Sequence, residues 1–130
     1  AAATEDLRAC GLSARKCAYA QGLAAAVVDG RLDVDGLATA ADEEVVAAIT
    51  ALKGFGRWSA EIYLLFALGR ADAFPADDLA VRLAMMRLKG LEDRLDAKAA
   101  RALAEPWQPF RGCAAIFLWH YYGAATLDAG

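Results

Sequence analysis

The sequence has few of the residues that build metal sites and covalent cross-links. It contains three cysteines, Cys10, Cys17 and Cys113, and a single histidine, His120. An odd number of cysteines at these spacings matches neither a zinc site nor a disulfide framework. We therefore expect three buried or half-buried thiols, and we interpret His120 as a surface or hydrogen-bonded residue rather than a catalytic base.

Long apolar runs and alternating strand patterns are also missing. No stretch reaches the roughly 20 uncharged residues that span a bilayer, and the start of the sequence lacks the charged and apolar regions of a signal peptide. These absences predict a soluble, cytoplasmic protein without membrane association. Val/Ile/Thr alternation is scarce whereas alanine is abundant, which predicts an all-α protein.

The sequence also lacks an excess of basic residues. The formal net charge is −3, which argues against a protein that holds nucleic acid by bulk attraction alone. If DNA is the partner, the basic residues must be concentrated on one face.

The chain length and composition predict one helical domain over residues 1–130, because 58% hydrophobic residues supply an ample core. Capping residues, glycines and prolines set the expected helix boundaries. Arg111, in the first turn of the last helix, is expected to pair with an acid, and Asp128–Gly130 to form a frayed end. The expected helices are one from Thr4 through Cys10, one from Ser13 through Val28, one that begins after Thr39, and others over 57–68, 77–88, 96–104 and 109–123.

The stretch from Leu52 to Leu79 combines a glycine turn with a pair of carboxylates. Gly54 and Gly56 predict a tight hairpin between helices, where the backbone can approach another molecule closely. Asp77 and Asp78 follow in a short loop before the next helix. Taken alone, such aspartates are more often helix caps than catalytic groups. A turn that can bind phosphate, followed by a helix that positions a carboxylate, nevertheless indicates chemistry on nucleic acid.

Three segments carry a family resemblance. Residues 52–61, LKGFGRWSAE, resemble the helix-hairpin-helix motif of the helix-hairpin-helix-GPD DNA glycosylases. Residues 74–79, FPADDL, resemble the loop and catalytic aspartate of that family. The segment from Trp107 to Trp119 resembles the C-terminal signature of one branch, DNA-3-methyladenine glycosylase II. Three matches in the right order are far more specific than a lone Gly-x-Gly.

The resemblance implies an all-α helical bundle that contains a helix-hairpin-helix motif. It covers the chain from about Leu7 onward, but members of the family normally have several more helices before this point. Those helices help to form the DNA wedge and to close the base pocket. We therefore expect either a fragment of a longer protein, comprising the larger C-terminal part of the glycosylase core, or a shortened member.

The implied activity is that of a monofunctional DNA N-glycosylase, which flips out and excises alkylated purines of the 3-methyladenine type in base excision repair. Asp78 matches the catalytic aspartate, whose carboxylate would stabilise the oxocarbenium-like transition state. Asp77 is then the expected N-cap of the following helix. Trp58 occupies the position where strand-cutting relatives have a lysine that forms a Schiff base. The resemblance thus implies release of the base, an abasic site and no strand cleavage.

Aromatic residues are implied to hold the damaged base. Trp58 and Trp119 match aromatic pocket positions, where a cationic alkylated purine is held by stacking and cation-π attraction worth ~0.5–2 kcal/mol per contact. A further aromatic of the family falls at Ile62 in this sequence. The alternative for each tryptophan is ordinary core packing.

The hairpin is implied to bind the DNA backbone through Lys53, Gly54, Phe55, Gly56 and Arg57, whose amides and charges offer donors to a phosphate. The implied partner is double-stranded DNA with a damaged base, bound by a monomer that is associated with the nucleoid if the source is bacterial.

No cofactor is required by the resemblance, and no iron-sulfur cluster is expected. A monovalent cation, Na⁺ or K⁺, is implied on the main-chain carbonyls of Thr50, Leu52 and Phe55. Two other readings stay open: a non-catalytic helix-hairpin-helix DNA-binding module in which Asp78 is only a cap, and a structural bundle that binds another protein.

Overall fold

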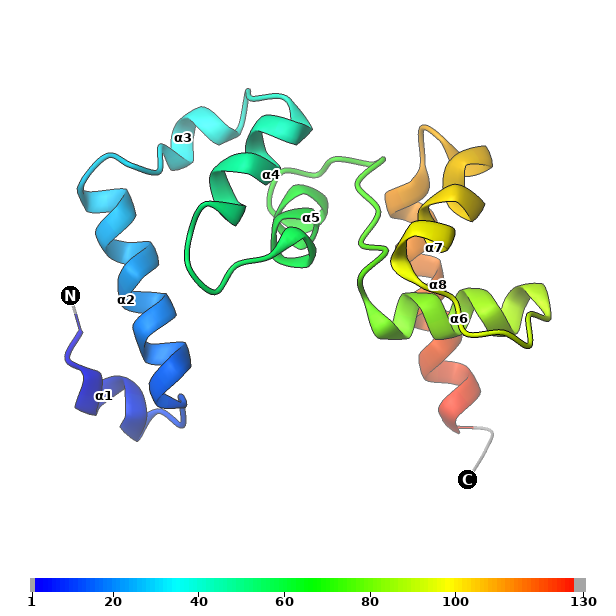
Figure 1. The fold of residues 1–130 in the computed structure, drawn as a ribbon, viewed down its shortest axis with the longest axis horizontal. Helices are drawn as coiled ribbons and strands as arrows, with labels where there is room; N and C mark the ends of the chain where they lie inside the picture. Colours follow the sequence, from blue (N-terminus) through cyan, green and yellow to red (C-terminus); the bar gives the residue numbers. More distant parts are fainter. Residues whose placement is uncertain (1, 128–130) are drawn as a thin grey trace. The chain divides into compact units, whose positions relative to one another are not determined.

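The computed structural model describes residues 2–127, so the expected frayed end at 128–130 lies outside the described residues. Within 2–127 the regular structure is helical and contains no strand, which confirms the all-α prediction. The chain divides into two compact units, residues 1–56 and 57–130 (Figure 1). The boundary falls between the glycine hairpin and the helix that follows it. No helix in the described part of the chain is long and apolar enough to cross a bilayer.

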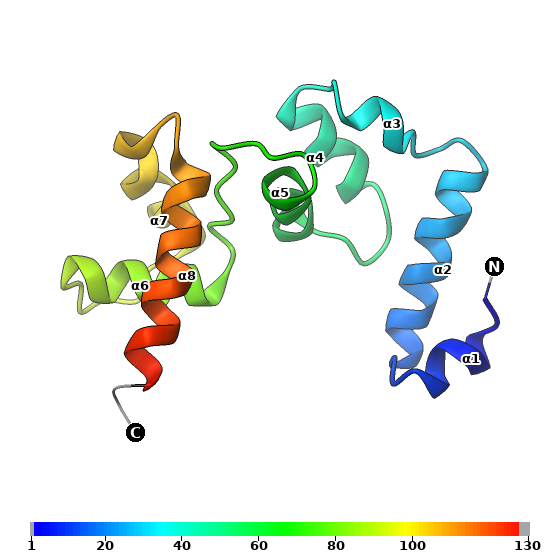
Figure 2. The same cartoon turned by 180° about the vertical axis from the view of Figure 1, so that it is seen from behind.

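The first unit is a succession of four helices. They are α1 (Thr4–Ala9), α2 (Ala14–Val28), α3 (Val34–Leu37) and α4 (Asp42–Thr50). Helix α1 lies against α2, and both views show the two side by side (Figures 1 and 2). The buried apolar residues of this unit are Cys17, Ala26, Leu32, Leu37, Val45, Val46 and Ile49.

The helix starts of the first unit match the sequence in part. Ser13 caps α2 as predicted, because its side chain accepts from the Lys16 amide at 3.3 Å. The Thr4 cap is wrong: the N-cap of α1 is Ala3, and the Thr4 hydroxyl instead accepts from Gln21 Nε2 at 3.2 Å. Helix α1 therefore begins one residue earlier than predicted, and Thr4 contacts α2 instead of capping α1.

Two of the three thiols differ from the prediction. Cys17 is buried, but Cys10 and Cys113 are exposed. Cys10 is the C-cap of α1, a helix that buries none of its residues, and this explains its exposure. His120 is exposed, as expected for a surface residue.

The second unit is built around two long helices. It comprises α5 (Arg57–Phe66), α6 (Leu79–Lys89), α7 (Ala97–Ala104), the 3₁₀ turn η1 (Glu105–Trp107) and α8 (Arg111–Leu127). Helices α6 and α8 make the most extensive contact of the unit and cross each other (Figure 2). Their shared core consists of Phe74, Ala76, Val81, Ala84, Met85, Leu95, Ala100, Ala104, Ala115 and Leu118.

The start of α8 is clamped to the loop between α5 and α6. Arg111 donates to both carboxylate oxygens of Asp72, at 2.8 Å from Nε and 2.6 Å from Nη2, which confirms the predicted pairing with an acid. The Gly112 amide donates to the Ala71 carbonyl at 2.7 Å. A Cβ at Gly112 would lie 2.6 Å from that same oxygen. This clamp fixes the start of α8, the helix that contains Trp119.

Candidate functional site

Asp78 is the residue that begins α6. It is the N-cap, and its Oδ1 accepts from the Val81 amide at 3.0 Å. The prediction that Asp77 caps this helix is wrong. The Asp78 amide donates to the Pro75 carbonyl at 3.0 Å, which closes a turn over Ala76 and Asp77. Asp77 therefore lies inside the turn, and Asp78 is the first carboxylate that reaches the free amides of α6.

Two tryptophans hold the same carboxylate from other helices. Trp58 Nε1 on α5 donates to Asp78 Oδ2 at 2.9 Å. Trp119 Nε1 on α8 donates to Oδ1 at 3.2 Å. Together with the Val81 amide, three N–H donors from three helices fix the orientation of the Asp78 carboxylate. The structure thus brings together the three residues that the sequence proposed for catalysis and base binding.

The aromatic surface beside Asp78 is partly open. Trp58 is 45% exposed, so it is not an ordinary core residue. Trp119 is half-buried and stacks on Phe66, with ring centroids 5.7 Å apart and an interplanar angle of 28°. Phe66 itself is 62% exposed. Sequence reasoning placed Phe66 only in the apolar pattern of α5; its position two helical turns after Trp58 was the available signal.

A buried ion pair supports the loop that carries Asp78. Glu61 on α5 is only 3% exposed and accepts from Arg57 Nε at 3.0 Å and from both Nη atoms of Arg101. Arg101 on α7 also donates to Asp77 Oδ2 at 2.9 Å and to the Phe74 carbonyl at 3.2 Å. The pair thereby joins α5, α7 and the loop before α6. Sequence reasoning missed it, although an acid inside an apolar helix was a usable signal.

The glycine hairpin turns at Gly54. The Phe55 amide donates to the Leu52 carbonyl at 3.2 Å, and Gly54 has a φ of +94°, as the third residue of a type II turn requires. A Cβ at Gly54 would also lie 2.3 Å from the Tyr19 ring on α2. Gly56 differs, because a Cβ there would meet nothing within 4 Å. Gly54 is therefore required by the fold, whereas Gly56 leaves a surface open to another molecule.

The described side chains offer no metal centre of the usual kind. Within residues 2–127, His, Cys, Asp and Glu form no group of three that could hold a metal ion. The monovalent cation would instead lie on the carbonyls of Thr50, Leu52 and Phe55, and it stays a prediction. The carbonyl of Leu52 already accepts the Phe55 amide.

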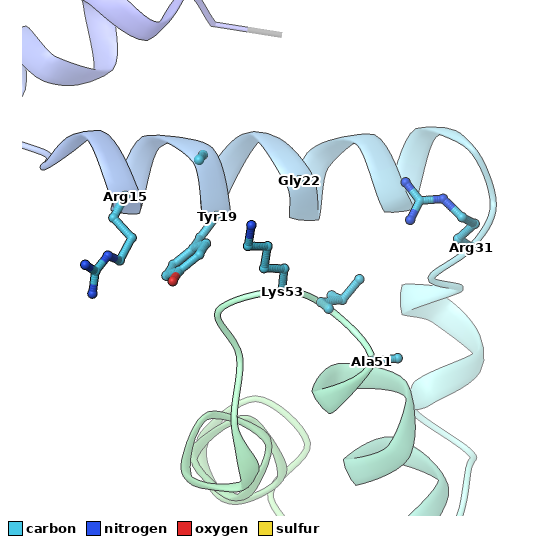
Figure 3. Close-up of a pocket in the computed structure, with 8 residues that line it drawn as sticks. Arg15, Tyr19, Gly22, Arg31, Ala51 and Lys53 are labelled. Atoms are coloured by element: carbon cyan, nitrogen blue, oxygen red, sulfur yellow. The ribbon is translucent and has the colours of Figure 1, made fainter.

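Each of the two units contains a cavity. One, of about 510 Å³, lies in the first unit between α2 and the hairpin (Figure 3). The other, of about 230 Å³, lies in the second unit and has an apolar lining from Leu88, Trp107, Ala114, Phe117 and Leu118. Neither is lined by Asp78 or by the two tryptophans that hold it.

Comparison with known proteins gives a consistent result. The sequence profile of the family described as HhH-GPD superfamily base excision DNA repair protein matches residues 1–109. DNA-3-methyladenine glycosylase 1 of Schizosaccharomyces pombe is 37% identical over 116 residues, which cover 88% of this chain and 51% of the relative. The chain thus spans about half the length of this curated relative.

Solved structures agree in fold. The S. pombe 3-methyladenine DNA glycosylase Mag1 in complex with abasic DNA has a TM-score of 0.85 and 35% identity, with 91% of this chain and 58% of that chain covered. A DNA-3-methyladenine glycosidase from Bacillus halodurans has a TM-score of 0.81 and 31% identity, with 97% and 58% covered. The profile match over most of the chain, supported by these likenesses, shows that the chain belongs to the HhH-GPD superfamily of base excision DNA repair proteins.

Proposed function

We propose that this chain is the catalytic part of a monofunctional DNA N-glycosylase that excises alkylated purines of the 3-methyladenine type from duplex DNA and leaves an abasic site. The observation that carries the proposal is the Asp78 carboxylate, held by Trp58, Trp119 and the first turn of α6. The names of the similar proteins support the substrate class.

Asp78 acts on the sugar of the damaged nucleotide. Positive charge develops on the sugar as the base departs, and a carboxylate fixed close to it stabilises that charge without reorganising during the reaction. The three donors to Asp78 supply this fixed orientation. Electrostatic stabilisation is its main role, and orientation of the attacking water is its second.

The damaged base binds the aromatic surface beside Asp78. Trp58 uses its indole N–H for Asp78, which leaves its exposed ring to stack on a cationic alkylated purine. Trp119 has one face on Phe66, so its other face and its ring edge are left for the base, while its indole N–H donates to Asp78. Trp58 has no amine that could form a Schiff base, which supports base release without strand cleavage.

The hairpin binds the DNA backbone. The amides of Gly54 and Gly56 have no acceptor among residues 2–127, so they can donate to a phosphate. Lys53 adds a positive charge, and Arg57 begins α5 with its guanidinium on Glu61. The main-chain carbonyls of Thr50, Leu52 and Phe55 would hold the monovalent cation. Such a contact is independent of sequence and suits a monomeric enzyme that searches all DNA before flipping the damaged nucleotide.

Release of free base from duplex DNA containing 3-methyladenine or 7-methylguanine tests the proposal. Asp78→Asn is the key variant, because asparagine caps a helix as well as aspartate does, and circular dichroism checks that the variant is folded. Asp77→Asn is the matched control, since it removes the neighbouring charge while its amide oxygen can still accept from Arg101. We expect base release to disappear in Asp78→Asn and to persist in Asp77→Asn, with no strand cleavage in either.

Absence of base release from the native full-length protein, together with salt-sensitive DNA binding, would instead favour the non-catalytic DNA-binding module. In that case Asp78 is a helix cap alone.

A further inference from the structure

The cavity between α2 and the hairpin is strongly basic. We call it the basic hollow: it is formed by Arg15, Tyr19 and Gly22 of α2, by Arg31, and by Leu52 and Lys53 of the hairpin, with two alanines beside them. Arg15 and Tyr19 extend from α2 toward the hairpin, and Lys53 extends from the hairpin toward α2 (Figure 3). Three cations from three segments thus surround one space of about 510 Å³.

Two of these cations form no ion pair within the part of the chain that the structure describes. Among residues 2–127, neither the Arg15 nor the Lys53 side chain has a hydrogen bond or an ion pair. Arg31 does pair with Asp29 at 3.2 Å, but both side chains are more than half exposed, so solvent screens this pair. The basic hollow is therefore a net positive site in a chain whose overall charge is −3.

The hollow adjoins the phosphate-binding turn. The ring of Tyr19 lies directly against Gly54, so the same α2 side chain that lines the hollow also supports the hairpin. Lys53 belongs to both, because it is the second residue of the turn. An anion in the hollow would consequently lie next to whatever binds the hairpin amides.

We propose that the basic hollow binds a second backbone phosphate of the same DNA strand, beside the phosphate held by the hairpin amides, with Arg15 as its main ligand. This inference rests on the proposed DNA-binding function. The exposed cations and open rim suit an extended polyanion, and a guanidinium from α2 together with an ammonium from the hairpin matches phosphate chemistry.

The test uses a duplex with one tetrahydrofuran abasic-site analogue, which fixes the register of the protein on the DNA. Uncharged methylphosphonates replace one phosphate at a time, and affinity is measured for the native chain and for the variants Gly56→Val, Arg15→Gln and Lys16→Gln. Lys16 is the matched control, since it is the next residue of α2, loses the same charge and does not line the hollow. Circular dichroism and thermal unfolding confirm that each variant is folded.

We expect two neighbouring methylphosphonates to weaken binding of the native chain, each about tenfold. In Gly56→Val, one of the two methylphosphonates no longer weakens binding. In Arg15→Gln, the other methylphosphonate no longer weakens binding, whereas in Lys16→Gln both still do. Arg15→Gln also reduces the slope of log affinity against log salt by about 0.9, the value for one phosphate.

The possible failures are distinguishable. If Arg15→Gln retains both penalties, as Lys16→Gln does, while the native chain still releases methylated bases, the hollow proposal is overturned and the glycosylase proposal stands. If both penalties appear as expected but no base is released, the hollow stands and the activity is overturned. A third outcome is that inorganic phosphate binds in a way that depends on Arg15, while only one methylphosphonate position weakens DNA binding. The hollow then binds free phosphate, and its assignment to DNA is overturned.

Discussion

Trp58 and Asp78, twenty residues apart, are joined by a hydrogen bond of 2.9 Å from the indole Nε1 to the carboxylate Oδ2. A residue expected to contact only the base therefore also positions the carboxylate proposed to act on the sugar. Trp119 supplies the second indole donor, to Oδ1. In the proposed mechanism, base recognition and stabilisation of the transition state would therefore depend on the same side chains.

Trp58→Phe separates these two roles, because phenylalanine keeps an aromatic face and removes the N–H donor. We expect the single-turnover rate of base release to fall about ten- to hundredfold, since one hydrogen bond to a charged group contributes roughly 1.5–3 kcal/mol. Affinity for DNA with an abasic-site analogue should change little. Trp107→Phe is the control, because Trp107 packs on Phe74 and does not contact Asp78. Equal rates for native and Trp58→Phe proteins would show that the hydrogen bond does not position the carboxylate.

Gly54→Ala and Gly56→Ala should differ strongly in stability. At Gly54 the φ of +94° and the Tyr19 ring both oppose a Cβ, so we expect the free energy of unfolding to fall by about 1–3 kcal/mol. At Gly56 a Cβ meets open space, and the change should stay within about 0.5 kcal/mol. Urea unfolding measures both. A stable Gly54→Ala protein would contradict the turn geometry.

Local signals explain what the sequence predicted well. Ser13 caps α2 and the glycine hairpin turns at Gly54, because each depends on residues a few positions apart. The choice between Asp77 and Asp78 as the cap could not be made locally, since either carboxylate suits an N-cap. Arg101, 24 residues further along the chain, binds Asp77.

Only part of the candidate site could be predicted from the sequence. Resemblance proposed Asp78, Trp58 and Trp119, but not that both indoles donate to the carboxylate, because this depends on how α5 and α8 meet α6. The Glu61–Arg101 pair spans 40 residues and leaves no periodic pattern. The basic hollow likewise arises only when α2 and the hairpin are brought together.

The clamp at the start of α8 predicts a pH dependence of stability. The Arg111 guanidinium, hydrogen-bonded to Asp72, holds the pKa of that carboxyl below its usual range. Because the folded pKa is lower than the unfolded value of about 3.9, the pair stabilises the fold above that pH. Its contribution is lost as the pH falls through the folded pKa.

Asp72→Asn tests the clamp. We expect it to lower the free energy of unfolding by roughly 1 kcal/mol at pH 7. The difference from the native protein should shrink as the pH falls below the unfolded pKa of about 3.9, as measured by urea unfolding across acidic and neutral pH. Asp96→Asn is a control of equal charge change, because asparagine retains the cap of α7. A difference between native and Asp72→Asn proteins that is independent of pH would show that the carboxylate charge does not stabilise the fold.

The buried Glu61–Arg101 pair gives the last prediction. Arg101→Met should lower the free energy of unfolding by about 3–5 kcal/mol, because it removes the main partner of a nearly buried carboxylate and also the donors to Asp77 and Phe74. The double variant Glu61→Leu with Arg101→Met should be less destabilised than Arg101→Met alone, since no unpaired charge then stays buried. Urea unfolding of the native chain, both single variants and the double variant completes the cycle. A double variant whose loss equals the sum of the single losses would show that the two residues act independently, and that Glu61 does not depend on Arg101 for its place in the core.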